Sequence, residues 1–236
     1  MIHLSIIVPA YNEEGRIGAT LEKITEFLKT KDYIFEVLVV DDGSSDRTAE
    51  IALKSELHSA GRLRLIKNES NKGKGYSVKK GIISSLGDYI LFSDADLSTP
   101  IEEVDKLYGF IGKDYDIVIG SRALAGSDVR VRQPWYRETM GKTFNFLVKL
   151  ILMKGINDTQ CGFKLFKSSV AKEIVSRMKT DGFSFDVEML YLAMRNNCKI
   201  KEVPVTWLNS PKSKVNPVID STRMLFDLIR IKLMHG

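Results

Sequence analysis

The sequence predicts an α/β protein whose central sheet is mostly parallel. Two patterns indicate this class: short apolar runs recur along the first half of the chain, and amphipathic helical segments separate them. Strands that are joined through helices form β-α-β units, and such units build parallel sheets. With 236 residues, 44% of them hydrophobic, the chain can bury the core of one globular unit.

The first half of the chain carries the regular part of this pattern. Its opening apolar run ends at Pro9, and a Val-rich run ends at the turn sequence Asp41-Asp42-Gly43. Ser44 offers a helix cap, and Thr99-Pro100-Ile101-Glu102 has the form of a capping box. The expected strands are residues 4–8, 35–40, 63–66, 89–92 and 116–119, and the expected helices are 17–28, 48–57, 74–85 and one from Pro100.

The second half is less regular and carries longer helical patterns. A polar, basic loop with Pro211 and Pro217 precedes the last helix. The expected helices are residues 133–153, 169–178, 185–195 and 218–234, the expected strands are 163–166 and 200–205, and the loop is 210–217. No internal repeat or obvious linker divides the chain, so we expect a single domain over residues 1–236.

The number of cysteines and the length of the apolar segments indicate in which cellular compartment the protein resides. Cys161 and Cys198 are too few for a disulfide scaffold and indicate free thiols in a reducing environment. No segment reaches the roughly 18 apolar residues that a membrane span needs, and the amino end lacks the features of a signal peptide. We therefore expect a cytoplasmic protein.

Charge is distributed unevenly along the chain. Residues 1–120 contain 15 Lys and Arg against 20 Asp and Glu, whereas residues 121–236 contain 20 against 10. An acidic first half suits a bound cation, and a basic second half suits phosphates, an anionic membrane or nucleic acid. A merely solvated surface is an equally good interpretation of charge alone.

Three carboxylate-bearing turns follow predicted strands: Asn12-Glu13-Glu14, Asp41-Asp42 and Asp94-Ala95-Asp96. In open parallel sheets the ligand site lies beyond the carboxyl ends of the strands. We therefore expect these acids to converge on one edge of the sheet. A carboxylate at Asp41-Asp42 could accept hydrogen bonds from a ribose or a base there, although a polar turn is the simpler interpretation.

Asp94 and Asp96 are the candidate metal ligands. Mg²⁺ and Mn²⁺ prefer oxygen ligands, and they often take one or two carboxylates together with phosphate oxygens. The same residues would also suit an ordinary acidic turn before the Pro100 helix, so the pair alone does not decide between the two interpretations.

Basic residues near the same edge indicate anion binding. Asn71-Lys72-Gly73-Lys74-Gly75 precedes a helix whose first N–H groups suit phosphate, although its spacing is not that of a Walker A loop and a plain turn is an equal alternative. Arg122 ends the fifth strand, and guanidinium groups bind phosphate through paired hydrogen bonds. Further arginines follow at Arg130, Arg132 and Arg137.

Two more acids, Asp186 and Glu188, lie at the start of a predicted helix. Carboxylates in a first helical turn complement the helix dipole, and we favour that role for Glu188. Asp186 could also lie near the site.

In order and spacing, these motifs resemble those of the family-2 glycosyltransferases of the GT-A type, over roughly residues 3–232. Within that family, residues 158–166 and 185–188 are most similar to polyprenyl-phosphate hexose synthases, in particular the dolichyl-phosphate glucosyltransferases. The motifs are Ile6-Ile7-Val8-Pro9-Ala10-Tyr11-Asn12-Glu13, Val39-Val40-Asp41-Asp42-Gly43-Ser44, Asn71-Lys72-Gly73-Lys74-Gly75, Asp94-Ala95-Asp96 and Gly120-Ser121-Arg122.

The resemblance implies a Rossmann-like GT-A fold and the transfer of a hexose, with UDP-glucose as the implied donor, to a polyprenyl or dolichyl phosphate. Residues 1–120 would bind the nucleotide sugar and residues 121–236 the acceptor. The implied catalytic residues are Asp94, Asp96, Arg122 and Arg137. The implied donor-nucleotide residues are Pro9, Tyr11, Glu13, Asp41, Asp42, Lys74 and Asp94. Asp96 and Asp94 would hold Mg²⁺ or Mn²⁺, and Arg122, Arg137, Lys212 and Lys214 would hold the acceptor phosphate.

Two features depart from the family pattern. Mannosyl members often carry Gln at the position of Ser98, which weakens the analogy with transferases that use GDP-mannose. Many members carry membrane spans after the catalytic domain. This chain would instead be peripheral on the cytoplasmic face of a membrane, held there by a surface helix (residues 133–153 or 218–234) or by a membrane-protein partner.

The chemistry of such a transfer suits these residues. A lipid phosphate carries about −1.5 to −2 charges near neutral pH and is already a nucleophile, so a strong general base is not required. The site has to position two anions and neutralise the leaving diphosphate. Direct displacement inverts the anomeric carbon.

Two other classes of function stay open from the residues alone. Nucleotidyl transfer to a sugar phosphate also needs a metal and a lysine, but Pro9-Ala10-Tyr11-Asn12 stands where its Gly-rich loop would follow the first strand. A non-catalytic module that binds membranes or polyanions would use the basic half and leave the converging acids unexplained. We expect no nucleic-acid partner.

Overall fold

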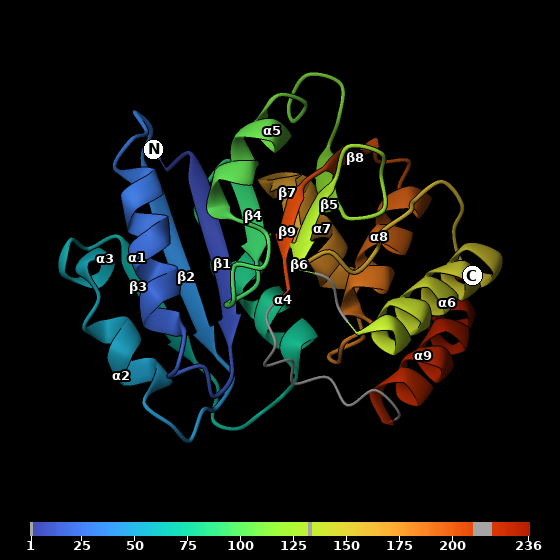
Figure 1. The fold of residues 1–236 in the computed structure, drawn as a ribbon, viewed down its shortest axis with the longest axis horizontal. Coiled ribbons are helices and arrows are strands. Elements are labelled where there is room, and N and C mark those ends of the chain that lie inside the picture. Colours follow the sequence, from blue (N-terminus) through green and yellow to red (C-terminus); the bar gives the residue numbers. More distant parts are fainter. Residues whose placement is uncertain (1, 132–133, 210–218) are drawn as a thin grey trace.

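The structure is a computed structural model, and it describes residues 2–131, 134–209 and 219–236. Its centre is a seven-stranded sheet with the strand order β3-β2-β1-β4-β7-β5-β8 (Figure 1). The strands are β1 (Leu4–Ala10), β2 (Phe35–Asp41), β3 (Leu63–Lys67), β4 (Tyr89–Ser93), β5 (Ile117–Ser121), β7 (Phe163–Lys167) and β8 (Ile200–Pro204). This mixed α/β architecture confirms the predicted class.

Strand β7 gives the sheet its mixed character. It pairs antiparallel with both β4 and β5, whereas the other pairings of this sheet are parallel. Strands β4 and β5 therefore both hydrogen-bond to a strand that comes more than forty residues later in the chain. A second, two-stranded sheet joins β6 (Asp128–Val131) to β9 (Thr206–Leu208).

Helices cover both faces of the large sheet because its strands alternate their side chains between two cores. Leu4, Ile6 and Val8 of β1 belong to one core, and Ile7 belongs to the other. The first core is completed by α1 (Ile17–Leu28), α2 (Thr48–Leu53), α3 (Glu56–Ser59), the short helix η1 (Ile101–Glu103) and α5 (Val104–Tyr108). The second is completed by α4 (Lys74–Ser84), α6 (Trp135–Ile151), α7 (Ser168–Arg177), α8 (Phe185–Arg195) and α9 (Ile219–His235).

Local structure differs from the sequence prediction at two helices. The helix expected over residues 48–57 is divided into α2 and α3, because the Ser55 side chain accepts a hydrogen bond from the His58 N–H and starts a new helix. The capping box at Thr99 was a wrong prediction: Pro100 precedes η1 without a side-chain cap, and the Thr99 hydroxyl instead lies 3.8 Å from Cys161 Sγ.

The two helices that were expected to contact a membrane are α6 and α9. Helices α6 and α9 lie side by side at one end of the molecule, and α9 also packs on α8 (Figure 1). Within the described residues, none of the helices has the length and apolar character that crossing a bilayer requires. The loop expected over residues 210–217 lies outside the described residues, as do Lys212 and Lys214.

Candidate active site

A cleft of about 1210 Å³ opens beyond the carboxyl ends of the parallel strands. Its lining comes from the ends of β1, β4 and β5, from the start of α4 and from α6, α8 and α9, so both halves of the chain contribute. Most of the residues singled out from the sequence border it: Pro9, Tyr11, Glu13, Asp42, Lys74, Asp94, Asp96 and Arg122. The expected convergence of acids from separate strand ends is therefore observed.

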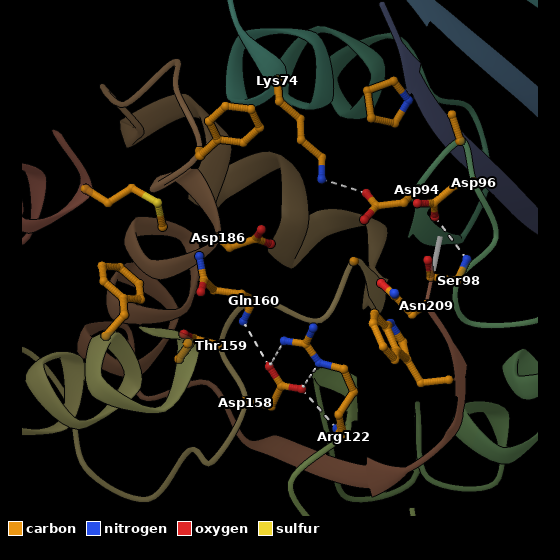
Figure 2. A pocket seen from close by; sticks show the side chains of 18 of the residues that line it. Lys74, Asp94, Asp96, Ser98, Arg122, Asp158, Thr159, Gln160, Asp186 and Asn209 are labelled. Carbon is orange, nitrogen blue, oxygen red and sulfur yellow. Dashed lines mark hydrogen bonds and ion pairs between the residues drawn. The ribbon is translucent and has the colours of Figure 1, made fainter. Parts of the chain in front are cut away.

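Asp94 is held at the cleft by close packing and by an ion pair. Lys74 Nζ lies 2.7 Å from Asp94 Oδ1, and Figure 2 marks this ion pair by a dashed line. The backbone of Gly162 passes so near that an added Cβ would lie 2.0 Å from Asp94 Oδ2, and Asp94 N donates to Gly162 O. Glycine at position 162 thus makes room for the carboxylate. Burial alone would lower the pKa of Lys74, but Asp94, Asp186 and Asp96 outweigh it and raise that pKa.

Asp96 faces a second cation, which the sequence prediction missed. Its Oδ1 accepts a hydrogen bond from Ser98 N, and Arg16 Nη1 lies 3.7 Å from its Oδ2. Arg16 also donates from Nη2 to Glu13 Oε1 at 2.8 Å and from Nε to the other oxygen. Glu13, expected at the nucleotide, therefore also orients an arginine toward the candidate metal ligands.

The Gly- and Lys-rich segment before α4 is held by internal hydrogen bonds. Asp42 accepts from Lys72 N at 2.9 Å and from Gly73 N at 2.8 Å. Gly75 N donates to Asp181 O, and a Cβ on Gly75 would lie 2.6 Å from Phe185 Cβ. These backbone N–H groups donate to acceptors within the protein, so they are not available to a phosphate as they are in helix-start phosphate sites. The segment instead presents the Lys74 ammonium to the cleft.

Asp41, at the end of β2, is fully buried. Its Oδ1 accepts from Ser44 N at 3.0 Å, whereas its Oδ2 has no hydrogen-bond partner among the described residues. An unsatisfied buried carboxylate oxygen is costly and is an acceptor that a donor N–H could satisfy. Asp41 does not line the cleft, whereas Asp42 lines it and holds the loop before α4.

Arg122 has a fixed partner that the sequence did not reveal. Its Nε lies 2.6 Å from Asp158 Oδ2 and its Nη2 lies 2.7 Å from Asp158 Oδ1, a bidentate pair seen in Figure 2. The guanidinium also lies over the Trp207 ring, 5.4 Å from its centre. Burial alone would raise the pKa of Asp158, but Arg122 outweighs it and holds that pKa below its ordinary value.

A buried pair, Lys164 and Asp186, lies beneath the cleft. Lys164 comes from β7 and is fully buried; its Nζ donates to Cys161 O at 2.6 Å and to Asp186 Oδ1. Asp186 borders the cleft from the first turn of α8 (Figure 2). Burial raises the pKa of Asp186, and this effect exceeds the opposing attraction of Lys164 and Lys74.

The remaining expected residues have varied positions. Glu188 is fully buried and accepts from Lys179 N, Thr180 N and His235, a structural role. Arg130 pairs with Asp128 on the exposed β6. Arg137 lies on α6, and its side chain is outside the described part of the chain, as is all of Arg132.

The residues fit a divalent cation supplied together with a diphosphate. Asp94 and Asp96 offer carboxylate oxygens at one strand end, the donor type that Mg²⁺ and Mn²⁺ prefer. Among the described residues there is no group of three or more His, Cys, Asp or Glu side chains that would enclose a metal by itself. Such a site needs further ligands from its substrate.

Comparisons with known proteins decide the family. The family model for "Glycosyl transferase family 2" matches residues 5–175. The chain belongs to glycosyltransferase family 2. The dolichyl-phosphate beta-glucosyltransferase of Dictyostelium discoideum is 38% identical over 245 residues, which cover 99% of this chain and 75% of that protein. The human protein of the same name is 35% identical over 244 residues, 98% of this chain and 75% of that one. The Saccharomyces cerevisiae protein is 36% identical over 251 residues, with 99% and 75% covered.

Solved structures of a glycosyl-transferring enzyme share the fold. Glucosyl-3-phosphoglycerate synthase from Mycobacterium tuberculosis in complex with UDP has a TM-score of 0.71 at 19% identity, and the match covers 98% of this chain and 79% of that chain. The same enzyme with Mn²⁺, UDP and glucosyl-3-phosphoglycerate has a TM-score of 0.72 at 18% identity, with 98% and 79% covered. The family and the GT-A fold expected from the sequence are thereby confirmed, and the protein is a glycosyltransferase.

Proposed function

We propose that the protein transfers glucose from UDP-glucose to a dolichyl or related polyprenyl phosphate, with inversion at the anomeric carbon. The observation that carries this proposal is the match of nearly the whole chain to several dolichyl-phosphate beta-glucosyltransferases at 35–38% identity. The cleft supports it, since Asp94 and Asp96 border the same space as the cationic side chains Lys74, Arg16 and Arg122.

On the donor side, the nucleotide would lie along the ends of β1 and β2. Pro9, Tyr11 and Asp42 border the cleft there. Asp41 Oδ2 has no hydrogen-bond partner among the described residues but is buried and does not line the cleft, so a nucleoside N–H or O–H would reach it only after neighbouring residues move. Asp94 and Asp96 would hold Mg²⁺ or Mn²⁺, which when bound supplies positive charge to the leaving diphosphate. Lys74 adds a further positive charge at the same place.

On the acceptor side, Arg122 would hold the lipid phosphate for attack. Asp158 occupies two of its nitrogens and fixes the plane of the guanidinium, so the group is oriented before the acceptor arrives. Arg137, Lys212 and Lys214 stay part of the proposed acceptor site on sequence grounds. No base is required, because the phosphate attacks as an anion.

Helices α6 and α9 would place the cleft at a membrane surface. Each has an inner stripe in the core, which includes Val148, Leu228 and Ile231, and an outer set of apolar side chains that stay exposed. The exposed set is Trp135, Phe146 and Leu150 on α6, with Phe226, Ile229 and Leu233 on α9. Exposed basic residues such as Lys142, Arg230 and Lys232 lie among them, a combination that suits an interfacial helix on anionic lipid.

The compartment follows from the same proposal. Both cysteines are free thiols, which agrees with a reducing environment. We therefore place the protein at the cytoplasmic face of a membrane, bound directly or through a membrane-protein partner.

A donor panel tests the proposed function. UDP-glucose, other UDP-hexoses and GDP-mannose are each supplied with a short polyprenyl phosphate, with Mn²⁺ or Mg²⁺ present or chelated. We expect the highest kcat/KM for UDP-glucose and loss of transfer in excess chelator. A higher kcat/KM for GDP-mannose would replace glucose with mannose. If UDP with Mn²⁺ does not even raise the Tm, a non-catalytic binding module becomes the better account.

A further inference from the structure

Each candidate metal ligand already faces a cationic side chain of the protein. Lys74 Nζ lies 2.7 Å from Asp94 Oδ1, and Arg16 Nη1 lies 3.7 Å from Asp96 Oδ2. The two carboxylates are thus compensated in charge before any ligand binds. A divalent ion that approached alone would have to take Asp94 from an ammonium and remain beside that ammonium as a like charge.

The Lys74 ammonium is confined to this position by its surroundings. It lies 5.4 Å from the centre of the Phe92 ring and 5.9 Å from that of Phe185. Its backbone is fixed on both sides, since Gly73 N donates to Asp42 and Gly75 N donates to Asp181 O. The side chain is 27% exposed and borders the cleft, so its head group can move within the cleft.

Asp186 makes a short movement of Lys74 feasible. Figure 2 shows Asp186 at the cleft, on the side of Lys74 away from Asp94. Its Oδ1 accepts a hydrogen bond from the buried Lys164. The ammonium therefore has a carboxylate behind it when it gives up Asp94. Lys164 and Asp186 are positioning residues in this arrangement, since they act on Lys74.

We propose that Lys74 exchanges partners during the reaction cycle: it pairs with Asp94 in the metal-free site and with the donor diphosphate once a metal–nucleotide complex binds. This inference rests on the proposed nucleotide-sugar function. A diphosphate brings the negative charge that a bare metal lacks, so it satisfies Lys74 while Asp94 turns to the metal. Metal and nucleotide consequently bind with positive coupling, and the coupling is reciprocal.

The test measures binding without an acceptor and without turnover. Mn²⁺ alone, UDP alone and Mn²⁺ in the presence of UDP are titrated by calorimetry into the wild type, Lys74→Met and Lys74→Arg. Lys72→Met is the matched control, because Lys72 lies two residues away in the same segment and is exposed. Thermal unfolding of each variant checks that it is folded.

The expected result is a pair of opposite changes. In Lys74→Met the affinity for Mn²⁺ alone rises by about tenfold, a change of about 1.4 kcal/mol, while the affinity for UDP falls by a similar factor. The enhancement of Mn²⁺ binding by UDP shrinks accordingly. Lys74→Arg and Lys72→Met stay near the wild type in their affinity for Mn²⁺ alone.

Two outcomes overturn the exchange. If Lys74→Met lowers the affinities for Mn²⁺ and for UDP equally, Lys74 only supports the structure of the site. If the affinity for Mn²⁺ alone is unchanged, Lys74 does not compete with the metal for Asp94. Failure of the proposed function has a different signature. In that case UDP does not bind the wild type, yet the comparison of Mn²⁺ alone between the wild type and Lys74→Met still tests whether Lys74 competes with metal.

Discussion

The two walls of the cleft are built in contrasting ways. On the proposed donor side, the rim loops are fixed by polar side chains: Asn12 N donates to Ser44 Oγ, Glu13 N to Thr48 Oγ1, and Lys72 and Gly73 N to Asp42. On the proposed acceptor side, α6 and α9 contribute cleft residues such as Phe144 and Met224 and leave large apolar side chains exposed. The first wall is suited to one polar ligand of fixed shape, and the second is suited to a long apolar one.

We expect the largest effect, and so the sharpest test of the contrast between the two walls, from removal of the proposed metal ligand Asp96. Asp96→Ala should lower turnover by roughly 10²–10³-fold, the usual cost of losing one electrostatic stabiliser of the transition state. Initial rates with UDP-glucose and a short polyprenyl phosphate measure it. Asp114→Ala, an exposed acid before β5, serves as the control. Full wild-type activity in excess chelator would contradict the metal dependence.

The second test concerns how closely the two walls meet. In Gly162→Ala the new Cβ would overlap the Asp94 carboxylate, which has to move. Because a displacement of about 1 Å can cost about 10²-fold in rate, we expect a loss of that order with little change in Tm. Gly15→Ala is the control, since nothing lies within 4 Å of its added Cβ. Equal rates in the two variants would show that Asp94 is not critically placed.

Arg122→Lys sharpens the assignment of the acceptor wall. Lysine keeps the charge but loses the two-point contact with Asp158. Hydrogen bonds to charged groups contribute about 1.5–3 kcal/mol, so a roughly 10–100-fold loss of kcat/KM for the acceptor is expected. UDP affinity, measured by calorimetry, should stay unchanged. Weaker UDP binding with an unaltered acceptor KM would move Arg122 to the donor side.

The smallest expected effect concerns the outer faces of α6 and α9. Co-sedimentation with anionic liposomes should be strong at low salt and weak at high salt, because each basic group near the surface contributes about 1 kcal/mol and is screened. Replacing Phe226 and Leu233 together with Ser should lower it by about fivefold. Replacing the exposed Ile83 and Leu86 with Ser is the control. Liposome binding that neither salt nor the α9 variant changes would favour recruitment by a partner.

The sequence predicted the features that depend on local pattern. Alternating strand and helix signals placed the ends of β1, β2 and β4 at one edge, and this topology alone brought Glu13, Asp42 and Asp94 toward a common cleft. The basic segments after the third and fifth predicted strands indicated Lys74 and Arg122 as anion-binding residues, and the resemblance to known family motifs gave them roles at the donor and at the acceptor phosphate. Both residues border the same cleft.

Long-range pairs could not be predicted in the same way. Asp158 lies 36 residues from Arg122, and Lys164 lies 22 residues from Asp186, so no local pattern links either pair. Lys164 was hidden further because a lysine in a strand normally indicates a solvent-facing side, whereas β7 is covered on both faces. Arg16, at the start of α1, was overlooked because a charged residue there looks like ordinary surface.

The insertion of β7 between β4 and β5 has a consequence for how the chain folds as it is made. On the ribosome, β1 to β4 can pair as they emerge, but among the described strands β5 pairs with β7 and β8, and both emerge later. Its apolar residues Ile117, Val118 and Ile119, all buried in the finished protein, must therefore wait through the synthesis of about 45 further residues before a neighbouring strand exists. During that interval β5 is an apolar strand without a sheet partner, the kind of segment that makes a partly folded chain prone to aggregate.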